Sequence, residues 1–178
     1  MFERKTELMD EQAMNRALTR ICYEIVEKNH GTQNLCVFGV LRRGAVFAQM
    51  MARRIGEMEN TSIDCSELDV TLYRDDLPCD RRQKVKLDWI KFQVENRKVI
   101  VVDDVFCTGR TARAAIDVIM DIGRPENIQL AVLIDRGHRE LPIRPDFVGK
   151  NVPTSKTEVI EVHVEEYDGE NCVILGSR

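Results

Sequence analysis

A nearly unbroken apolar run that ends in two acids is the feature that most constrains how this chain can fold. Residues 98–102 read Lys-Val-Ile-Val-Val, and Asp103 and Asp104 follow directly. Consecutive β-branched residues are typical of a strand that is covered on both faces of a parallel sheet. A turn containing Gly109 leads into residues 111–122, whose apolar positions have the three-to-four spacing of a helix. A strand that turns directly into a helix is the building unit of α/β proteins.

The same alternation extends along the rest of the chain. The spacing predicts a first helix that Asp10 caps and Gly31 ends, and a second helix from residue 45 to about residue 58. The predicted strands cover residues 35–40, 62–73, 98–103, 128–134, 159–165 and 172–175. The fold class is therefore α/β, with a mainly parallel central sheet flanked by helices and a C-terminal hairpin. We expect a single domain over residues 1–178.

Two segments lack a clear pattern. Residues 74–97 are rich in charge, and their tail at 89–92 is compatible with a short strand. Residues 135–155 contain three prolines and are expected to be irregular. A loop as long as 74–97 in a compact domain is usually functional or mobile, and the alternative is a plain surface insertion.

The charge balance excludes a protein that binds nucleic acid through its whole surface. The chain has 26 Lys and Arg against 30 Asp and Glu, which is a net charge of −4. A local basic patch is compatible with that balance. No apolar run approaches the roughly 18 residues that a membrane helix needs. The charged start, Met-Phe-Glu-Arg-Lys, is not that of a signal peptide.

The six cysteines are expected to be reduced thiols that act as small hydrophobes in a cytoplasmic protein. They form no Cys-x-x-Cys pair, and no cysteine and histidine have the sequence spacing of a zinc site. The six are Cys22, Cys36, Cys65, Cys79, Cys107 and Cys172.

The end of the apolar strand carries the residues of a candidate ligand site. Ligands of open α/β sheets bind beyond the carboxyl ends of the strands, where Asp103 and Asp104 are expected. Carboxylates accept hydrogen bonds and suit sugar hydroxyls, whereas the unpaired N–H groups at the start of the next helix suit a phosphate. Gly109 allows close approach of the backbone. The segment therefore suits a ribose phosphate, and the plainer alternative is that the acids and Thr111 only cap local structure.

Residues 99–111, Val-Ile-Val-Val-Asp-Asp-Val-Phe-Cys-Thr-Gly-Arg-Thr, resemble the signature for phosphoribosyl pyrophosphate (PRPP) of type I phosphoribosyltransferases. Other segments narrow the resemblance to the PyrR family, whose bifunctional members attenuate pyrimidine operons and transfer phosphoribose to uracil. These segments lie at residues 10–13, 16–21, 68–77, 123–125, 128–133, 135–144 and 149–156. The likeness covers nearly the whole chain and is weakest from 78 to 97.

The resemblance implies a type I phosphoribosyltransferase fold and a Mg²⁺-dependent reaction of uracil with PRPP that gives UMP and pyrophosphate. The implied catalytic residues are Asp103, Asp104 and Arg74. Mg²⁺ is expected to be held mainly through PRPP near the two acids, with no direct protein ligand. The long loop after Tyr73 matches the mobile flap of the family, which would close over PRPP and exclude water. The implied PRPP- and nucleotide-binding residues are Arg42 and Arg43 for the diphosphate, Asp103 and Asp104, the turn residues Val105, Phe106, Cys107, Thr108, Gly109, Arg110 and Thr111, and Arg136 for the base.

The regulatory half of the family implies that the chain also binds leader RNA in response to a uridine nucleotide. The implied RNA contacts are Thr19, Arg20, Arg139, Arg144 and Lys150. Residues 135–156 hold five Lys and Arg against three acids, a local balance of +2 in a chain of −4. RNA is usually read through such local arginines, but a solvated polar loop has the same composition.

Two places depart from the family pattern. The diphosphate loop reads Leu41-Arg42-Arg43-Gly44 where the family has Lys-Thr-Arg-Gly, and Tyr23 stands where RNA-binding members often carry histidine. Two alternatives stay open: an RNA regulator with little catalytic activity, and a transferase for another nucleobase. The partners that the resemblance implies are PRPP, uracil, UMP, pyrimidine-operon leader RNA and further copies of the chain in a homo-oligomer.

Overall fold

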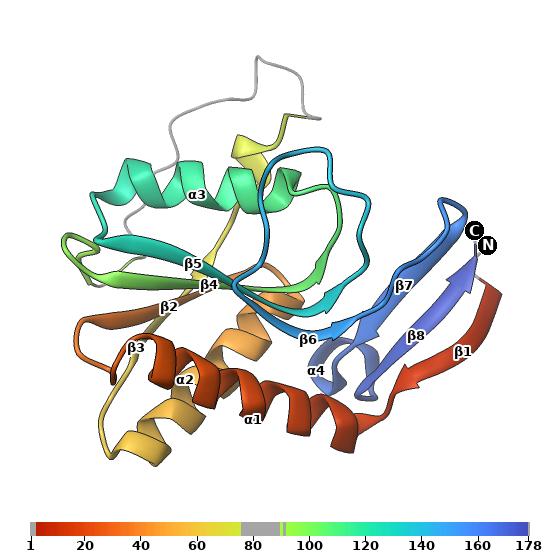
Figure 1. Ribbon diagram of the computed structural model, residues 1–178, viewed down its shortest axis with the longest axis horizontal. Coiled ribbons are helices and arrows are strands. Elements are labelled where there is room, and N and C mark those ends of the chain that lie inside the picture. Colours follow the sequence, from red (N-terminus) through yellow and green to blue (C-terminus); the bar gives the residue numbers. More distant parts are fainter. Residues whose placement is uncertain (1–2, 76–89, 91, 178) are drawn as a thin grey trace.

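The computed structural model describes residues 3–75, 90 and 92–177, and its strands form two sheets (Figure 1). The larger sheet is parallel with the order β3-β2-β4-β5-β6, and the small sheet is antiparallel with the order β1-β8-β7. The strands are β1 (Glu3–Met9), β2 (Leu35–Val40), β3 (Asp64–Leu68), β4 (Lys98–Phe106), β5 (Asn127–Asp135), β6 (Phe147–Asn151), β7 (Glu158–His163) and β8 (Cys172–Ser177). The helices are α1 (Glu11–Lys28), α2 (Arg43–Glu59), α3 (Arg110–Ile122) and α4 (Glu165–Asp168), with a 3₁₀ turn η1 (Thr71–Tyr73). This architecture confirms the predicted α/β class and the closing hairpin.

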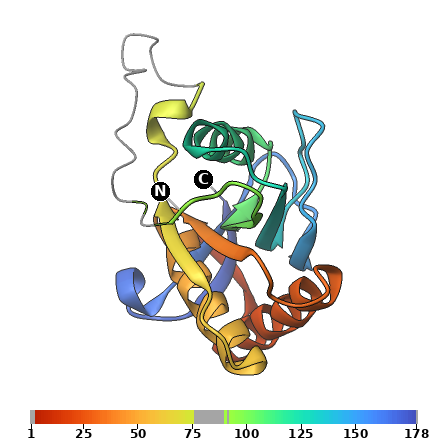
Figure 2. The same cartoon turned by 90° about the vertical axis from the view of Figure 1, so that its left-hand side faces the viewer.

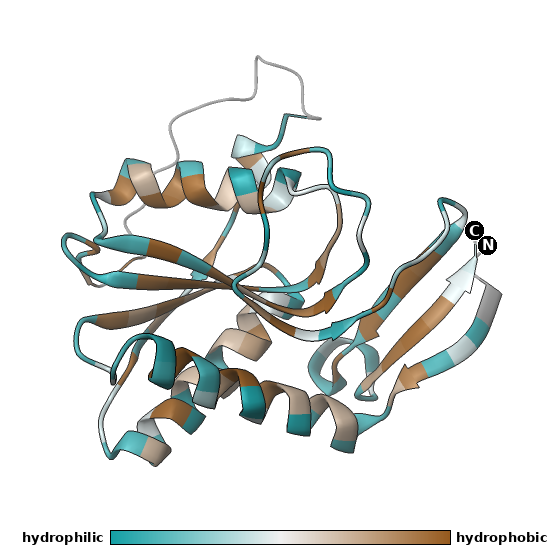
Figure 3. Cartoon of the chain, in the orientation of Figure 1, coloured by the Kyte–Doolittle hydropathy of each residue, from teal (hydrophilic) through white to brown (hydrophobic). Residues whose placement is uncertain are grey.

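β4 lies at the centre of the parallel sheet, as its apolar run predicts. Val101 is paired with Phe38 of β2 on one side and with Leu130 of β5 on the other. Helices α1 and α2 cover one face of the sheet and α3 covers the other (Figures 1 and 2). Hydrophobic residues are concentrated on the strands between these helix layers (Figure 3). The two-sided cover explains why β4 has no polar alternation along its buried half.

The first helix forms as its sequence predicts. Asp10 accepts a hydrogen bond from the N–H of Ala13 at 2.7 Å and caps the start of α1. At the other end, the side chains of Asn29 and Gln129 exchange two hydrogen bonds of 3.0 and 2.8 Å, which satisfy two buried amides. The apolar stripe that faces the sheet consists of Met14, Ala17, Leu18, Ile21, Cys22 and Ile25.

The strand predicted over residues 62–73 is shorter than expected at both ends, since β3 covers only Asp64–Leu68. Asp69 accepts a hydrogen bond from the N–H of Thr71 at 2.9 Å, and this local turn competes with pairing in the sheet. The prediction of a strand over 69–73 is therefore wrong. The strand considered at 89–92 is absent at residues 90 and 92, and the rest of the predicted flap, 76–89 with residue 91, lies outside the described residues.

Neither β1 nor β6 is predicted by the sequence pattern. β6 lies inside the segment 135–155 that was expected to be irregular, so that prediction is wrong at residues 147–151. Only Phe147 of this edge strand is buried, and a Cβ on Gly149 would lie 2.5 Å from the carbonyl oxygen of Leu133. Among the described side chains of β1, only Met9 is buried. An edge strand is paired with a neighbour on one side only, and many of its side chains face solvent. Its sequence therefore shows only a weak apolar pattern.

Two predictions from composition can be compared with the structure. None of the five described cysteines forms a disulfide, and Cys79 lies outside the described residues. Burial raises the pKa of Cys22, Cys36 and Cys65 to about 11, so these thiols stay protonated at neutral pH. No helix in the described part of the chain is both long and apolar enough to cross a bilayer.

Candidate functional site

β4 carries the acidic pair at the carboxyl edge of the parallel sheet. The strand continues to Phe106, beyond its predicted end at Asp103, because Val105 still pairs with Ile134 of β5. Both acids therefore lie in the strand and not in the turn. Asp103 Oδ1 accepts a hydrogen bond from the N–H of Asp104 at 2.9 Å, and Asp104 Oδ1 accepts one from the N–H of Val105 at 2.7 Å. These bonds fix the orientation of both carboxyl groups.

The environment of Asp103 favours its neutral form. Burial, followed by the negative charge of Asp104, raises the pKa of Asp103 well above the usual carboxyl range. A carboxylic acid can donate a hydrogen bond as well as accept one, whereas a carboxylate only accepts. The pair thus offers both a donor and acceptors to a ligand with hydroxyl groups.

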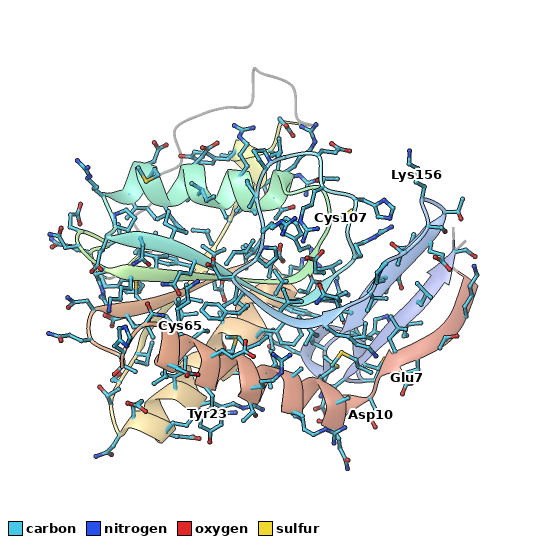
Figure 4. The ribbon with its side chains drawn as sticks, viewed as in Figure 1. Glu7, Asp10, Tyr23, Cys65, Cys107 and Lys156 are labelled. Carbon is cyan, nitrogen blue, oxygen red and sulfur yellow. The ribbon has the colours of Figure 1, made fainter. Side chains whose placement is uncertain are left out.

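The turn after β4 is shaped by a glycine and by a neighbouring loop. Gly109 has a φ of +91°, in the left-handed region that glycine adopts without strain, and it precedes α3. The carbonyl oxygen of Thr108 accepts hydrogen bonds from the N–H groups of Glu140 at 3.0 Å and Leu141 at 3.2 Å. The first turn of α3 contains no acidic residue. Its N–H groups and positive dipole end can therefore receive an anion beside Cys107, which Figure 4 labels near this end of α3.

The loop between β2 and α2 lies against the end of β4. A Cβ on Gly44 would be 2.6 Å from the carbonyl oxygen of Val102 and 3.1 Å from the Cα of Asp103. Only glycine permits so close an approach of two backbones. The approach brings Arg42, which is exposed, and Arg43, which is half-buried, to the edge that holds the acidic pair. We call this group, residues 41–44, 103–104 and 107–111, the strand-end site.

Asp168 at the end of α4 holds Arg43. The Arg43 guanidinium donates from Nε to Oδ2 at 3.1 Å and from Nη2 to Oδ1 at 2.7 Å. Asp168 also accepts a hydrogen bond from the N–H of Val164 at 2.9 Å. The hydrogen bond from Arg43 is the main reason why the pKa of Asp168 lies below its usual range. The sequence contains no signal for this partner, which is 125 residues from Arg43.

The loop after β5 is fastened to the segment before β7. Arg136 donates from Nε to Thr154 Oγ1 at 3.1 Å and from Nη2 to the carbonyl oxygen of Glu158 at 2.7 Å. His138 Nε2 lies 2.7 Å from the carbonyl oxygen of Thr154. The backbone N–H of Arg136 donates to the carbonyl oxygen of Phe106 at 3.0 Å. Arg136 is thus held beside the turn that follows β4.

The start of the predicted flap is docked on α3. Tyr73 donates a hydrogen bond of 2.6 Å to Asp121, and burial together with this bond raises the pKa of Tyr73 to about 12. Asp75 forms an ion pair with Arg110, the first residue of α3. Arg74 lies exposed between these two anchors. Its position at the stem of the loop is therefore tied to α3 through residues near both ends of that helix.

Three of the residues implied for RNA lie on α1 or on the neighbouring edge strand β6, with Arg20 and Lys150 at the contact of the two elements and Thr19 on the side of α1 that faces α2. Arg20 donates from Nη2 to two carbonyl oxygens of β6 at 2.9 and 2.7 Å. Thr19 Oγ1 accepts a hydrogen bond of 3.1 Å from Arg54 of α2. Lys150 donates from Nζ to a carbonyl oxygen of β1 at 3.0 Å. All three side chains are thus already used inside the molecule, although each remains partly accessible.

The other two implied RNA contacts lie in the segment between β5 and β6. Arg139 is paired with the buried Asp135, and its guanidinium lies 5.5 Å from the ring centroid of Phe106. The structure therefore places Arg139 beside the strand-end site and not at the contact of α1 with β6. Arg144 is exposed just before β6. Tyr23 is 59% exposed on α1 and is labelled in Figure 4.

Comparison with known proteins gives close relatives along the whole chain. The family model for the phosphoribosyl transferase domain matches residues 5–174. The bifunctional protein PyrR of Acetivibrio thermocellus is 55% identical over 172 residues, which cover 96% of this chain and 94% of the relative. The bifunctional protein PyrR of Clostridioides difficile (strain 630) is 52% identical over 172 residues, covering 96% and 97%. That of Bacillus cereus (strain AH820) is 53% identical over 177 residues, covering 98% of each.

Solved structures share the same arrangement of elements at low identity. The hypoxanthine phosphoribosyltransferase of Trypanosoma cruzi has a TM-score of 0.73 and 17% identity, with 98% of this chain and 97% of that chain covered. A hypoxanthine phosphoribosyltransferase from Staphylococcus aureus has a TM-score of 0.70 and 18% identity, with 98% and 93% covered. Identity this low supports a common fold and nothing about the base that is bound.

Proposed function

The chain belongs to the phosphoribosyltransferase domain family and, within it, to the bifunctional PyrR proteins, and from that premise we propose that the strand-end site transfers ribose 5-phosphate from PRPP to uracil. The products are UMP and pyrophosphate. One observation carries the proposal: the approach of Gly44 to Val102 and Asp103 sets the arginine loop beside the acids and the turn. These three parts supply donors for a diphosphate, partners for ribose hydroxyls and N–H groups for a 5-phosphate.

The reaction replaces one bond at C1 of the ribose by another. The bond from C1 to the diphosphate oxygen breaks, and the leaving diphosphate takes the electron pair. The bond from C1 to N1 of uracil forms, and the N1 proton passes to water. Negative charge develops on the diphosphate, where the guanidinium of Arg43, oriented by Asp168, would stabilise it. Positioning of the two substrates supplies much of the remaining rate.

Each residue set has a proposed role. Asp103 and Asp104 bind the ribose hydroxyls, and the N–H groups of residues 107–111 bind the 5-phosphate. Arg42 and Arg43 bind the diphosphate, with exposed Arg74 joining them from the stem of the flap. Arg136, held beside the turn after β4, helps to form the pocket for the base.

The carboxyl groups of Asp103 and Asp104 fit Mg²⁺ only if PRPP supplies other ligands to the same ion. When bound to PRPP, Mg²⁺ would neutralise charge on the diphosphate. Asp103 and Asp104 are hard oxygen donors, as this ion prefers, but two carboxyl groups are too few for an octahedral ion. We therefore propose that PRPP oxygens and water supply most ligands, while the two acids orient the complex.

A second function, binding of pyrimidine-operon leader RNA to attenuate transcription, is favoured by the contact of α1 with β6. Arg20 and Lys150 lie there, Thr19 follows on the side of α1 that faces α2, and the exposed ring of Tyr23 offers a stacking surface on the same helix. Arg139 shares a loop with Arg136, so a nucleotide at the strand-end site can influence an RNA contact. We further propose that the 178 residues form one domain that acts in the cytoplasm as a homo-oligomer.

A direct assay tests the enzymatic proposal. Purified protein is given PRPP, Mg²⁺ and either uracil, hypoxanthine or guanine, and UMP formation is expected with uracil alone. Asp104→Asn should lower turnover at least about 100-fold, the usual effect of losing a positioned charged group. Asp64→Asn, the same change at the start of β3 on the opposite edge of the sheet, is the control. Undiminished turnover by Asp104→Asn would contradict the role of this acid.

The RNA proposal has its own assay. Mobility shift with the leader RNA of the pyrimidine operon, with and without UMP, should show tighter binding in the presence of the nucleotide. Thr19→Ala should weaken that binding. Absence of any UMP-enhanced binding at low salt would contradict the regulatory function while leaving the enzymatic one in place.

A further inference from the structure

The end of the β7–β8 hairpin brings together three side chains that bind metals. His163, the last residue of β7, is paired directly with Cys172, the first residue of β8. Directly paired residues of antiparallel strands project their side chains from the same face. Glu170 from the connecting loop lies beside them, and its Oε1 is 2.9 Å from Nδ1 of His163. One ligand atom from each of the three lies within 4.8 Å of the others.

We propose that His163, Glu170 and Cys172 form a binding site for Zn²⁺. A nitrogen, a thiolate sulfur and a carboxylate oxygen are the three ligand types that Zn²⁺ takes in proteins, whereas Mg²⁺ and Ca²⁺ avoid sulfur. Two ligands bound to one tetrahedral Zn²⁺ lie about 3.3–3.8 Å apart, given bond lengths of about 2.0–2.3 Å. The widest donor pair therefore needs to close by about 1 Å, whereas Nδ1 of His163 and Oε1 of Glu170, now 2.9 Å apart, need to separate slightly. Small rotations of the half-exposed Glu170 side chain and of the His163 ring can provide both changes.

A fourth residue supports the histidine as a ligand. Glu161 lies two residues before His163 on β7, so both side chains share one face of the strand. Its Oε2 is 3.6 Å from Nε2 of His163, on the ring nitrogen away from Glu170. Ligating histidines commonly give their other ring N–H to a carboxylate, which fixes the tautomer and the ring orientation. The arrangement assigns Nδ1 to the metal and Nε2 to Glu161, and leaves the fourth metal position to water.

The spacing of cysteine and histidine in the sequence does not indicate this metal site, because the β7–β8 hairpin brings its ligands together. Cys172 and His163 become neighbours only through the pairing of β7 with β8, and no Cys-x-x-Cys or His-x-x-x-His pattern is present. The segment between the two ligands contains α4, and Asp168 at the end of that helix holds Arg43. A metal bound here would therefore brace the turn that orients the arginine of the strand-end site.

Metal titration of the full-length protein, stripped with a chelator, tests the proposal. We expect one equivalent of Zn²⁺ to bind and to raise the melting temperature, while Mg²⁺ at the same concentration does not. Co²⁺ should bind in place of Zn²⁺ and produce a thiolate-to-cobalt charge-transfer band. His163→Gln, at a half-buried position, and Glu170→Gln, at an exposed one, should each weaken Zn²⁺ binding at least about tenfold. Glu161→Gln should weaken it about tenfold, as expected for a carboxylate behind a ligand.

The cysteine is tested by spectrum, with matched controls. Cys172→Ala should abolish the cobalt charge-transfer band, whereas Cys65→Ala and His30→Gln, which change a half-buried thiol and an exposed imidazole elsewhere, should leave both band and affinity intact. Should Cys172→Ala fail to fold, the variants His163→Gln and Glu170→Gln decide the question. The proposal is overturned if Co²⁺ produces no such band, or if neither of these two variants changes the affinity.

Discussion

Arg43 and Asp168 form a two-point ion pair across the two sheets of the molecule, with N–O distances of 3.1 and 2.7 Å. Arg43 begins α2 beside the parallel sheet, and Asp168 ends α4 in the turn of the small sheet. A paired guanidinium and carboxylate constrain each other in direction as well as in distance. The loop that is proposed to bind diphosphate is therefore oriented from outside its own sheet.

Replacement of Asp168 by asparagine should weaken PRPP binding. The amide can still accept the hydrogen bond from Val164, but it loses the charge that holds Arg43. We expect KM for PRPP to rise about tenfold, corresponding to about 1.4 kcal/mol, with a smaller change in kcat. Asp168→Ala should in addition lower the melting temperature, because it leaves the Val164 N–H without its acceptor. Equal KM values for the wild type and Asp168→Asn would contradict the positioning role.

Gly44→Ala should separate the arginine loop from the acidic pair. The new methyl group would meet the carbonyl oxygen of Val102 at 2.6 Å, so the loop must move outward. A displacement of about 1 Å at a catalytic site can cost about 100-fold in rate, and we expect kcat/KM to fall by that much. Gly56→Ala is the control, since its Cβ would lie 2.7 Å from the carbonyl oxygen of Thr61 near the other end of α2. It should lower the melting temperature but leave KM for PRPP unchanged.

The sequence predicts those parts of the fold in which a single segment carries enough apolar residues. β4, with residues 99–102 all buried, and α1, with its cap at Asp10, are such segments. The edge strand β6 is not predicted, because only Phe147 is buried and Gly149 lies in close contact with the backbone of Leu133. The opposite error occurs at residues 69–73. Their apolar pattern predicts a strand, but the turn that Asp69 makes takes its place. Burial on both faces is visible in a sequence, whereas pairing at an edge is not.

The residues of the strand-end site and their partners likewise form two groups, one that the sequence predicts and one that it does not. Asp103, Asp104 and Gly109 are predicted because they follow one another along the chain at a strand end. Asp168, Thr154 and the group around His163 are not predicted, because only the folded arrangement of the strands, helices and loops brings them near their partners. A signature motif thus identifies the candidate binding residues of its own segment. The side chains that orient the site come from other parts of the chain.

Asp103→Asn should raise stability at neutral and alkaline pH. In the unfolded chain Asp103 ionises near its ordinary pKa of about 4, whereas burial and Asp104 raise its pKa in the folded protein. Below pH 4 the side chain is protonated in both states, so wild type and variant should be equally stable. As the pH rises toward the folded pKa, the wild type loses stability and the variant does not. We expect a gain of about 1 kcal/mol at pH 8, typical of a stabilising change at a functional site, with lower activity.

Urea denaturation from about pH 3 to pH 8 measures this difference. The two proteins should give the same midpoint at the acid end of this range, and their midpoints should diverge above about pH 4. Glu57→Gln, which removes one exposed negative charge on α2, is the control for the general effect of losing an acidic side chain. A constant gap between wild type and Asp103→Asn across the range would contradict a raised pKa of Asp103.

Arg20 and Arg144 should respond differently when each is changed to alanine, although both are implied RNA contacts. Arg20 bonds two carbonyl oxygens of β6, so its loss should cost about 1–2 kcal/mol of folding stability as well as RNA affinity. Arg144 is exposed and makes no hydrogen bond or ion pair with the residues that the structure describes, so its loss should leave the melting temperature unchanged. If Arg144 binds an RNA phosphate, the slope of log K against log salt should fall by about 1 in the variant. Filter binding from 50 to 300 mM salt measures that slope, and an unaltered slope would remove Arg144 from the RNA interface.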